Sequence, residues 1–305
     1  MSLKIGFAII TYNEPGQLLR LVKTLNAMFD APPIVCHHDF SQCPLDEALF
    51  PPNVRFVHPH IGTGWCHINT LFSAFKAFRL LRDSDQPDWF VLLSGSDYPV
   101  RPASEILAEL SSTNYDVYLE NREILSPIAP TGQTAKVGYG RPSWIPLAYD
   151  RYLALHLWLP LPSRRRLFPF QRRCIHIRNP VLIKMFQAGR PSRIFGGAFW
   201  LQLNRKAMDR LLDDSSVPKI VEYFGARPVP EEALFHTILC NQPDLTICND
   251  HKRYEDWVLG ASHPSWLEVE DVTKMRLSGA HFARKFRADG LVQDVIDETV
   301  LGIST

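Results

Sequence analysis

The stretch that decides the fold is Asp88–Pro99, DWFVLLSGSDYP, in which an apolar run stops at a small polar turn. Residues Phe90–Leu93 form the continuous apolar run expected of a strand that is covered on both faces. In open α/β sheets, ligands bind beyond the carboxyl ends of the strands, so Asp97 stands where a nucleotide or a sugar could be held. A purely structural interpretation is also open, in which Asp97 caps a helix that begins near Pro102.

Strands and helices alternate through roughly the first 120 residues. Apolar patterns predict strands over residues 4–12, 33–38, 54–58 and 89–94, and helices over residues 17–29 and 67–81. Tyr12 and Asn13 follow the first strand, and Asp39 follows the second. We therefore expect an α/β fold with a mostly parallel, doubly wound sheet and a nucleotide-binding half. No GxGxxG follows the first strand and no GxxxxGK[ST] occurs, so neither common phosphate-binding motif supports this expectation.

The composition is that of a soluble globular protein. Of the 305 residues, 46% are hydrophobic and 21% are charged, and the formal net charge is +1. Such a balance argues against a dedicated nucleic-acid-binding protein. Neither a signal peptide nor a transmembrane span is expected, which favours a cytoplasmic location, and the six scattered cysteines are expected to be reduced thiols.

We expect one domain over residues 1–305 with three parts. Residues 1–121 form the nucleotide-binding half, residues 122–195 an insertion, and residues 196–305 the half that carries the acceptor side and the catalytic group. Prolines interrupt the insertion, which we expect to fold against the sheet and cover a site. Its basic residues are Arg164, Arg165, Arg166, Arg172, Arg173 and Arg178. They suit either a solvated face or a patch for an anionic acceptor or a lipid headgroup surface. After the insertion, residues 198–203 predict a strand and Asn204 the cap of a helix.

Two further segments carry chemically useful side chains. Glu231 and Glu232 follow Pro230 and open a predicted helix, where they either complement the helix dipole or include a general base. In HFARKF, residues 281–286, the cations Arg284 and Lys285 are adjacent. An extended strand would point them to opposite faces, whereas a bend could aim both at one anion. With Arg253 they could bind a diphosphate, or all three could be surface cations beside core aromatic residues.

A group of histidines invites a metal-site interpretation. His37, His38 and Asp39 end the second predicted strand, and His58 and His60 follow the third. Adjacent residues on a strand face opposite ways, so His37 and His38 cannot both bind one ion in regular geometry. We therefore favour core or turn histidines and expect no metal.

In chain order, these segments resemble the core-2/I-branching N-acetylglucosaminyltransferase and peptide O-xylosyltransferase family. The matching segments, over residues 4–287, are the HHD at 37–39, the segment of Trp65, DWFVLLSGSDYPV at 88–100, GGAFWLQLNRKA at 196–207, PEEALFHTIL at 230–239, and NDHKRYEDW, GASHP and SGAHFARKF within 249–286. The resemblance implies a glycosyltransferase fold of the A type and inverting transfer from a UDP-sugar without an obligatory metal.

The resemblance also implies roles for individual residues. Glu232 matches the catalytic base, and Glu231 is expected to cap the helix. Lys285 matches the lysine that binds the diphosphate. Arg284 and Arg253 would belong to the same charge cluster. The remaining positions implied for the donor and acceptor pocket are Asp97, Trp200 and Gly197, and those implied for the uridine side are Tyr12, Asn13 and Asp39.

These expectations define a bacterial-type cytoplasmic enzyme of polysaccharide biosynthesis. It would move N-acetylglucosamine or xylose from a UDP-sugar to a glycan or lipid-linked acceptor, with peripheral contact at the inner membrane surface and no nucleic-acid partner. One alternative is a non-catalytic protein that binds a sugar nucleotide or a glycan. Another is a metal-dependent hydrolase built on His37, Asp39 and His58.

Overall fold

A computed structural model describes residues 3–128, 144–162, 170–187, 189–258, 261 and 263–303. Its centre is a sheet with the strand order β12-β6-β11-β4-β1-β2-β3. The strands are β1 (Ile5–Thr11), β2 (Ile34–His38), β3 (Val54–Phe56), β4 (Trp89–Ser94), β6 (Val117–Leu119), β11 (Leu201–Asn204) and β12 (Ile247–Cys248). All neighbouring pairs are parallel except those of β11, which runs antiparallel to β4 and β6. The predicted mostly parallel α/β sheet is confirmed.

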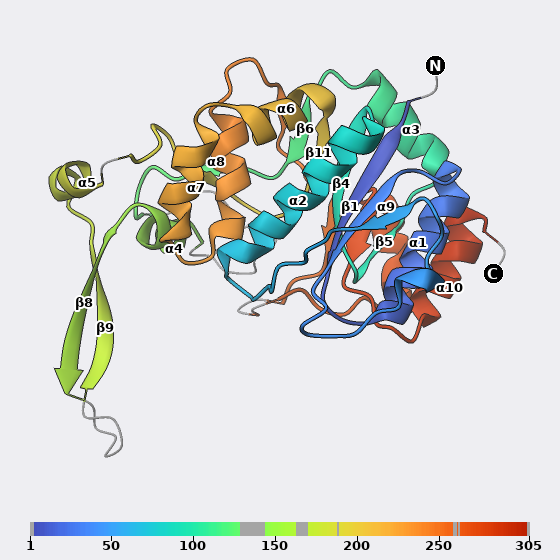
Figure 1. The fold of residues 1–305 in the computed structure, drawn as a ribbon, viewed down its shortest axis with the longest axis horizontal. Coiled ribbons are helices and arrows are strands. Elements are labelled where there is room, and N and C mark those ends of the chain that lie inside the picture. The colour runs from blue at the N-terminus through green and yellow to red at the C-terminus, as the bar shows by residue number, and fades with distance from the viewer. Residues whose placement is uncertain are drawn as a thin grey trace.

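Helices cover both faces of this sheet (Figure 1). Strand β4 shows why its sequence is continuously apolar. Phe90 and Leu92 belong to one hydrophobic cluster, with the helices α2 (Ile68–Asp85), α6 (Arg205–Asp213), α7 (Val217–Gly225) and α8 (Leu234–Cys240). Val91 and Leu93 belong to a second cluster, with the helices α1 (Pro15–Phe29), α3 (Ala103–Ser112), α9 (Val272–Leu277) and α10 (Leu291–Ile296). Successive side chains of a strand alternate between faces, so a strand buried on both sides must be apolar at every position.

A smaller sheet brings together three segments that are far apart in sequence. Its order is β13-β14-β5, with β13 at Arg253–Glu255, β14 at Phe282–Arg284 and β5 at Asp97–Pro99. The pairing places Arg284 opposite Asp97 and opposite Glu255. The interpretation of Asp97 as a helix cap is wrong, because α3 has Pro102 at its N-cap and no side-chain cap. The Asp97 carboxylate instead folds back onto Ser94, whose amide and hydroxyl donate to it at 2.7 and 2.9 Å.

The helix predicted from Pro230 to Cys240 is broken in two. Pro230–Glu232 form a single 3₁₀ turn, η2, and Ala233 separates it from α8. The predicted Asn204 cap is confirmed, since its side chain accepts a hydrogen bond from the amide of Ala207 at 2.9 Å. The remaining short elements are η1 (Glu47–Leu49), η3 (Val269–Asp271) and η4 (Asp297–Leu301).

The insertion is only partly packed against the body. It contains β7 (Arg122–Glu123), α4 (Trp144–Tyr152), β8 (Leu155–Pro162), β9 (Phe170–Ile177), α5 (Pro180–Phe186) and β10 (Phe195–Gly196). Helix α4 buries Trp144, Ala148 and Tyr152 in the same cluster as α2 and α8, as expected of a segment that folds against the sheet. Strands β8 and β9 pair with each other and project away from the body (Figure 1). Arg164, Arg165 and Arg166 lie outside the described residues.

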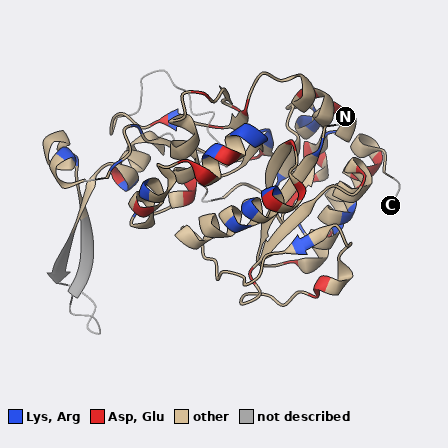
Figure 2. Ribbon diagram, turned by 45° about the horizontal axis from the view of Figure 1, so that its top comes forward, with Lys and Arg blue, Asp and Glu red and all other residues tan. Residues whose placement is uncertain are grey.

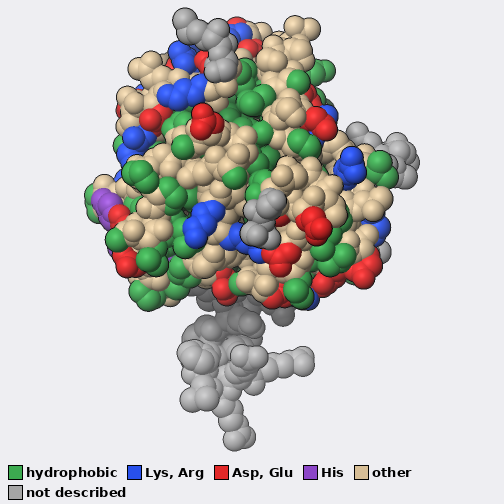
Figure 3. Space-filling model, turned by 90° about the vertical axis from the view of Figure 1, so that its right-hand side faces the viewer, with side chains coloured by type: hydrophobic (Ala, Val, Ile, Leu, Met, Phe, Trp, Pro, Cys, Tyr) green, Lys and Arg blue, Asp and Glu red, His purple; other side chains and the backbone are tan. Residues whose placement is uncertain are grey.

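Charges of both signs are interspersed over most of the body. Figure 2 shows Lys and Arg beside Asp and Glu along the helices that cover the sheet. Figure 3 shows the same mixture on the side of the molecule that lies at the right of Figure 1. Within the described part of the chain, no helix is both long enough and apolar enough to cross a membrane.

Candidate active site

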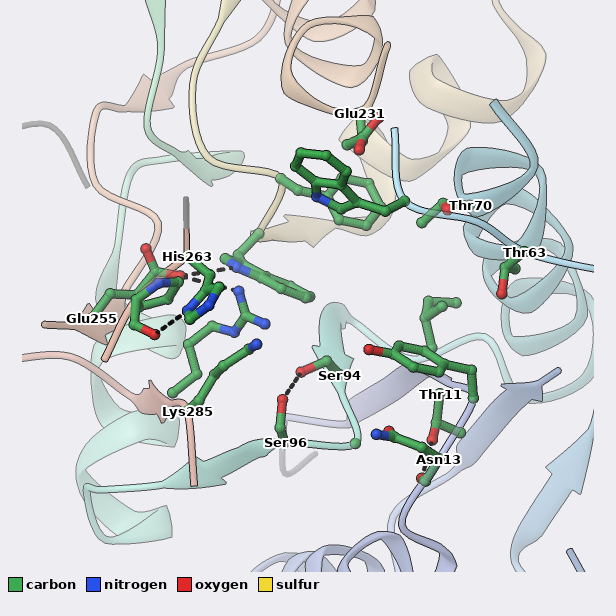
Figure 4. A pocket seen from close by; sticks show the side chains of 18 of the residues that line it. Thr11, Asn13, Thr63, Thr70, Ser94, Ser96, Glu231, Glu255, His263 and Lys285 are labelled. Carbon is green, nitrogen blue, oxygen red and sulfur yellow. Dashed lines mark hydrogen bonds and ion pairs between the residues drawn. The ribbon is translucent and has the colours of Figure 1, made fainter. Parts of the chain in front are cut away.

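A cavity of about 920 Å³ opens at the carboxyl ends of β1 and β4. Its size is in the range of small-molecule sites. Tyr12 and Asn13 line it after β1, and the turn Ser94–Ser96 lines it after β4. In Figure 4, Asn13 and Ser96 lie on one side of the cavity and Glu231 lies across it. The structure thus brings the residues after both strands to one cavity, where a doubly wound sheet holds its ligand.

Arg284 and Lys285 both line the cavity (Figure 4 labels Lys285). The Arg284 guanidinium lies 4.4 Å from the ring centre of Trp200, and its Nε lies 3.2 Å from Oδ1 of Asp97. The Lys285 Nζ lies 5.3 Å from the ring centre of Trp266, and among the described residues no ion pair of this ammonium is found. Burial and the neighbouring Arg284 charge lower the pKa of Lys285. A bound anion would relieve both effects, because it stabilises the charged ammonium.

Asp97 and Arg253 do not line the cavity, so the expectation that they contact a ligand directly is not met. The Arg253 side chain is 1% exposed, and its second guanidinium nitrogen donates to the carbonyl of Leu92 at 2.7 Å. Asp97 is fully buried and forms ion pairs with both Arg253 and Arg284, at 3.3 and 3.2 Å. Arg253 therefore balances the charge of Asp97, and Asp97 holds Arg284 at the cavity wall.

Glu231 and Glu232 both line the cavity from η2, but their surroundings differ. Oε2 of Glu232 accepts hydrogen bonds from Arg151 at 2.7 Å and from the indole of Trp144 at 3.2 Å. Oε1 of Glu231 accepts from the amide of Cys66 at 3.2 Å, whereas its buried Oε2 has no hydrogen-bond partner in the described part of the chain. Burial and the neighbouring Glu232 charge raise the pKa of Glu231 to about 7. The expected helix cap at Glu231 is wrong, since α8 begins only at Leu234 and the carboxylate contacts a different segment.

Three of the remaining predicted residues line the cavity and two support it from behind. Tyr12, Asn13 and Trp200 are lining residues, whereas Asp39 and Gly197 are not. Asp39 is buried, and its carboxylate accepts hydrogen bonds from Ser41, Gln42 and Thr63, of which Gln42 and Thr63 line the cavity. Burial alone would raise the pKa of Asp39, but these hydrogen bonds hold it well below its usual range.

Gly197 occupies a position that leaves no room for a side chain. Its amide donates to the carbonyl of Glu232 at 2.9 Å, and a Cβ at this residue would lie 2.3 Å from the carbonyl oxygen of Glu120. The glycine therefore lets the chain run directly beneath η2.

Sequence reasoning missed several residues that line the cavity. Arg151 and Trp144 come from the insertion, outside every quoted motif, and only the fold shows that they meet Glu232. Glu255 stands two residues after Arg253 in KRYEDW and lies within 3.5 Å of Arg284. The position of that motif was a usable signal for Glu255, whereas the insertion offered none for Arg151.

The histidines that invited the alternative metal-site interpretation do not converge on one point. The His37 Nε2 accepts from the amide of Ile61 at 3.0 Å, the His38 Nε2 lies 2.7 Å from the carbonyl of Cys43, and His58 pairs with Glu47. The ring nitrogens of the three histidines thus contact three different segments. Among the described residues, no three His, Cys, Asp or Glu side chains lie together as metal ligands would.

The sequence of this chain is similar to one family model and to several known transferases. The model of the family described as Core-2/I-Branching enzyme matches residues 173–279. The chain is 29% identical to beta-glucuronosyltransferase GlcAT14A of Arabidopsis thaliana over 239 residues, which cover 76% of this chain and 46% of that protein. It is 25% identical to xylosyltransferase 1 of Homo sapiens over 278 residues, which cover 82% of this chain and 24% of that protein. The chain thus spans about half the length of the plant relative and about a quarter of the human one.

A solved structure, S. aureus TarS 1-349 in complex with UDP-GlcNAc, aligns over 90% of this chain and 64% of its own length. The sequence identity is 9% and the TM-score is 0.32, which does not by itself establish a shared fold.

The fold and the cavity define an α/β protein with a candidate ligand site at the carboxyl ends of a mostly parallel sheet. The sequence comparisons are more specific and agree with the motif order. Over residues 173–279 the chain is similar to the Core-2/I-Branching enzyme family, and over most of its length it is similar to the plant and mammalian transferases.

Replacing Gly197 by alanine should destabilise the protein. The added Cβ would meet the backbone of Glu120 at 2.3 Å, so the chain must shift, at a cost of about 1–3 kcal/mol. Urea denaturation measures this loss. Gly225→Ala is the matched control, because nothing lies within 4 Å of its added Cβ. Equal stabilities of the two variants would contradict the close approach at Gly197.

Replacing Glu231 by glutamine should stabilise the protein at alkaline pH. The pKa of Glu231 is raised from 4.5 to about 7, so the folded state binds this proton more tightly than the unfolded state. The resulting stability is present below pH 4.5 and is lost as the pH rises through 7. At pH 8.5 the ionised carboxylate costs about 3 kcal/mol, which Glu231→Gln removes.

Denaturant titrations at pH 4.5 and 8.5 test this expectation. The difference between variant and wild type should be small at the lower pH and large at the higher one. Glu222→Gln, on the exposed side of α7, is the control and should show no such dependence. A pH-independent effect of Glu231→Gln would contradict the raised pKa.

Proposed function

We propose that this protein is an inverting glycosyltransferase that moves a sugar from a UDP-sugar to a hydroxyl acceptor without an obligatory metal. The observation that carries the proposal is the polarity of one cavity. Two cations, Arg284 and Lys285, and two carboxylates, Glu231 and Glu232, line the same cavity. A transfer from a nucleotide sugar needs positive charge at the departing diphosphate and a proton acceptor at the incoming hydroxyl. The similar proteins include a beta-glucuronosyltransferase and a xylosyltransferase, which supports the same reaction class.

In the proposed reaction, the acceptor oxygen attacks the anomeric carbon as the bond from that carbon to the UDP oxygen breaks. Glu232 takes the proton of the attacking hydroxyl, and UDP departs with the electron pair of the broken bond. Arg284 and Lys285 stabilise the negative charge that grows on the diphosphate, with Arg284 held ready by Asp97. The uridine would lie at Tyr12 and Asn13, beyond the end of β1.

The two carboxylates have distinct proposed roles. Glu232 receives hydrogen bonds from Arg151 and Trp144, which orient its Oε2 and favour a charged carboxylate. A base must be ionised before it can accept a proton, so Glu232 remains the proposed base. Glu231, whose pKa is near 7, is the neighbour that can hold a proton while Glu232 is charged.

The donor sugar belongs to a narrow set. N-acetylglucosamine and xylose are the sugars that the resemblance to the family implies, and the plant relatives add glucuronic acid. Glucuronic acid differs from xylose by a carboxylate on C5, so a cation near the sugar would discriminate between them. The proposed acceptor is a glycan or a lipid-linked glycan. It would enter beside Trp65, a cavity-lining residue whose side chain is 86% exposed.

Removal of the base should abolish turnover and leave donor binding intact. We expect Glu232→Gln to bind UDP as the wild type does and to lose about 10²–10⁴-fold in kcat. Release of UDP from UDP-xylose, UDP-glucuronate and UDP-N-acetylglucosamine with candidate acceptors measures the loss, and calorimetry measures the binding. Glu231→Gln is the matched variant and should retain more activity.

Two results would overturn this assignment. Near-normal turnover of Glu232→Gln, with a severe loss in Glu231→Gln, would move the base to Glu231. Binding of UDP-sugars without UDP release from any donor and acceptor would instead favour a protein that binds sugar nucleotides without catalysis.

Removal of the Lys285 ammonium should weaken UDP binding and transfer together, since the diphosphate carries charge in both states. We expect Lys285→Ala to raise the Kd for UDP by about tenfold or more, the size of one charge-assisted contact. Lys23→Ala, an exposed lysine of α1, is the control and should leave the Kd unchanged. Wild-type activity should persist in EDTA. Activity that EDTA abolishes and Mg²⁺ restores would show that a metal carries the leaving-group charge.

A further inference from the structure

The segment of residues 155–190, here called the arm, differs in charge from the rest of the chain. It contains β8, β9 and α5 and no Asp or Glu. Its cations are Arg164, Arg165, Arg166, Arg172, Arg173, Arg178, Lys184 and Arg190. The arm therefore carries +8 in a chain whose net charge is +1, and the remaining residues together carry −7. A charge asymmetry of this size within one chain indicates an anionic partner for the basic part.

The hairpin of the arm lacks the support that strands normally have. Strands β8 and β9 pair over eight positions, from Leu155↔Ile177 to Pro162↔Phe170, and no other described strand pairs with either. Leu157 and Ile175 face each other across this pair and are 46% and 45% exposed. An isolated two-stranded hairpin is only marginally stable in water. Its solvent-exposed apolar pair therefore indicates that the hairpin packs against a further surface.

Helix α5 presents apolar side chains outward beside the hairpin. Ile183 is buried, and the Gln187 side chain donates to the carbonyls of Leu153 and Ala154, so the helix is tied to the body. Met185 and Phe186 are nevertheless 68% and 70% exposed. Lys184 stands between them and the buried Ile183, and Figure 2 shows a basic and no acidic residue on α5. The helix thus offers large apolar side chains and positive charge together.

We propose that the arm docks the protein onto an anionic lipid bilayer. Phe186, Met185 and the Leu157–Ile175 pair would enter the interfacial region, while Lys184 and Arg190, described cations of the arm, would lie at the lipid phosphates. A soluble polyanion would be bound by the cations but would leave the apolar side chains in water, so it explains only half of the surface. A symmetric dimer paired arm to arm would bring one acid-free arm against another, which like-charge repulsion opposes.

The position of the arm relative to the cavity gives this docking a consequence. Helix α4 supplies Trp144 and Arg151 to the cavity, and β8 begins three residues after α4 ends. Docking through the arm would hold this side of the cavity near the bilayer surface. If the proposed glycosyl transfer holds, an acceptor carried on a lipid would then reach the cavity without leaving the membrane.

Vesicle flotation with the full chain tests the docking without any activity measurement. We expect the wild type to float with vesicles of phosphatidylglycerol and phosphatidylcholine, to bind pure phosphatidylcholine at least tenfold less, and to be released by 0.5 M salt. The double variant Met185→Ser/Phe186→Ser should lose at least tenfold in partitioning. Lys184→Glu should weaken binding to the anionic vesicles selectively.

The control removes equal apolar surface from the opposite part of the molecule. Leu277 and Leu291 are 80% and 64% exposed on α9 and α10, and Leu277→Ser/Leu291→Ser should float as the wild type does. Failure of the wild type to float, or unchanged flotation of Met185→Ser/Phe186→Ser, would overturn the proposal. A dimer in light scattering that this double variant dissociates, without vesicle binding, would also overturn it and assign the surface to self-association. Glu232→Gln should float normally, so the docking and the transferase activity succeed or fail separately.

Discussion

The buried carboxylate of Asp97 is the constraint on which the site depends. It lies between two guanidinium groups, those of Arg253 and Arg284, at 3.3 and 3.2 Å, in a place that water does not reach. Removing one partner of such a buried pair typically costs about 3–5 kcal/mol, because the remaining charge is left uncompensated. The three groups come from β5, β13 and β14, so this one interaction joins three distant segments of the chain. It also determines where Arg284, the only member of the trio that lines the cavity, can point.

The two carboxylates across the cavity, Glu231 and Glu232, differ in how well their surroundings balance their charge. Glu232 is paired with Arg151, whereas Glu231 keeps a buried oxygen without a hydrogen bond and a pKa of about 7. Such a group makes the folded state less stable at neutral pH than a neutral side chain would. Strongly shifted pKa values of this kind cluster at functional sites, where burial and neighbouring charges are arranged for the chemistry. Arg284 is thus stabilised by the buried Asp97, whereas Glu231 is destabilised by its surroundings.

The sheet and the cavity position could be predicted from the sequence because local patterns determine both. The apolar run of β4 and the polar residues after β1 and β4 are short-range signals, and the structure agrees with them. The roles of Asp97 and Glu231 could not be predicted, since each depends on a partner far along the chain. Arg284 is 187 residues beyond Asp97, and Cys66 lies 165 residues before Glu231. Local sequence favoured a helix-cap role for both residues. In the structure, each carboxylate instead contacts a residue far away along the chain, Arg284 for Asp97 and Cys66 for Glu231.

The insertion shows where motif-based inference ends and why. Arg151 donates a hydrogen bond to Glu232 but lies outside the motifs that indicated the family, whereas Glu232 itself lies within one of them. The same segment continues into the acid-free arm, so the contact to Glu232 and the basic surface are separated by only a few residues. The charged wall beside Asp97 and the carboxylates of η2 come from segments with a recognisable pattern, as chemistry common to a family requires. Residues that discriminate between acceptors have no such requirement, and under the proposed function they would come from α4 and the arm. The acceptor side of the cavity and the surface that would bring an acceptor to it are therefore parts of one contiguous piece of chain.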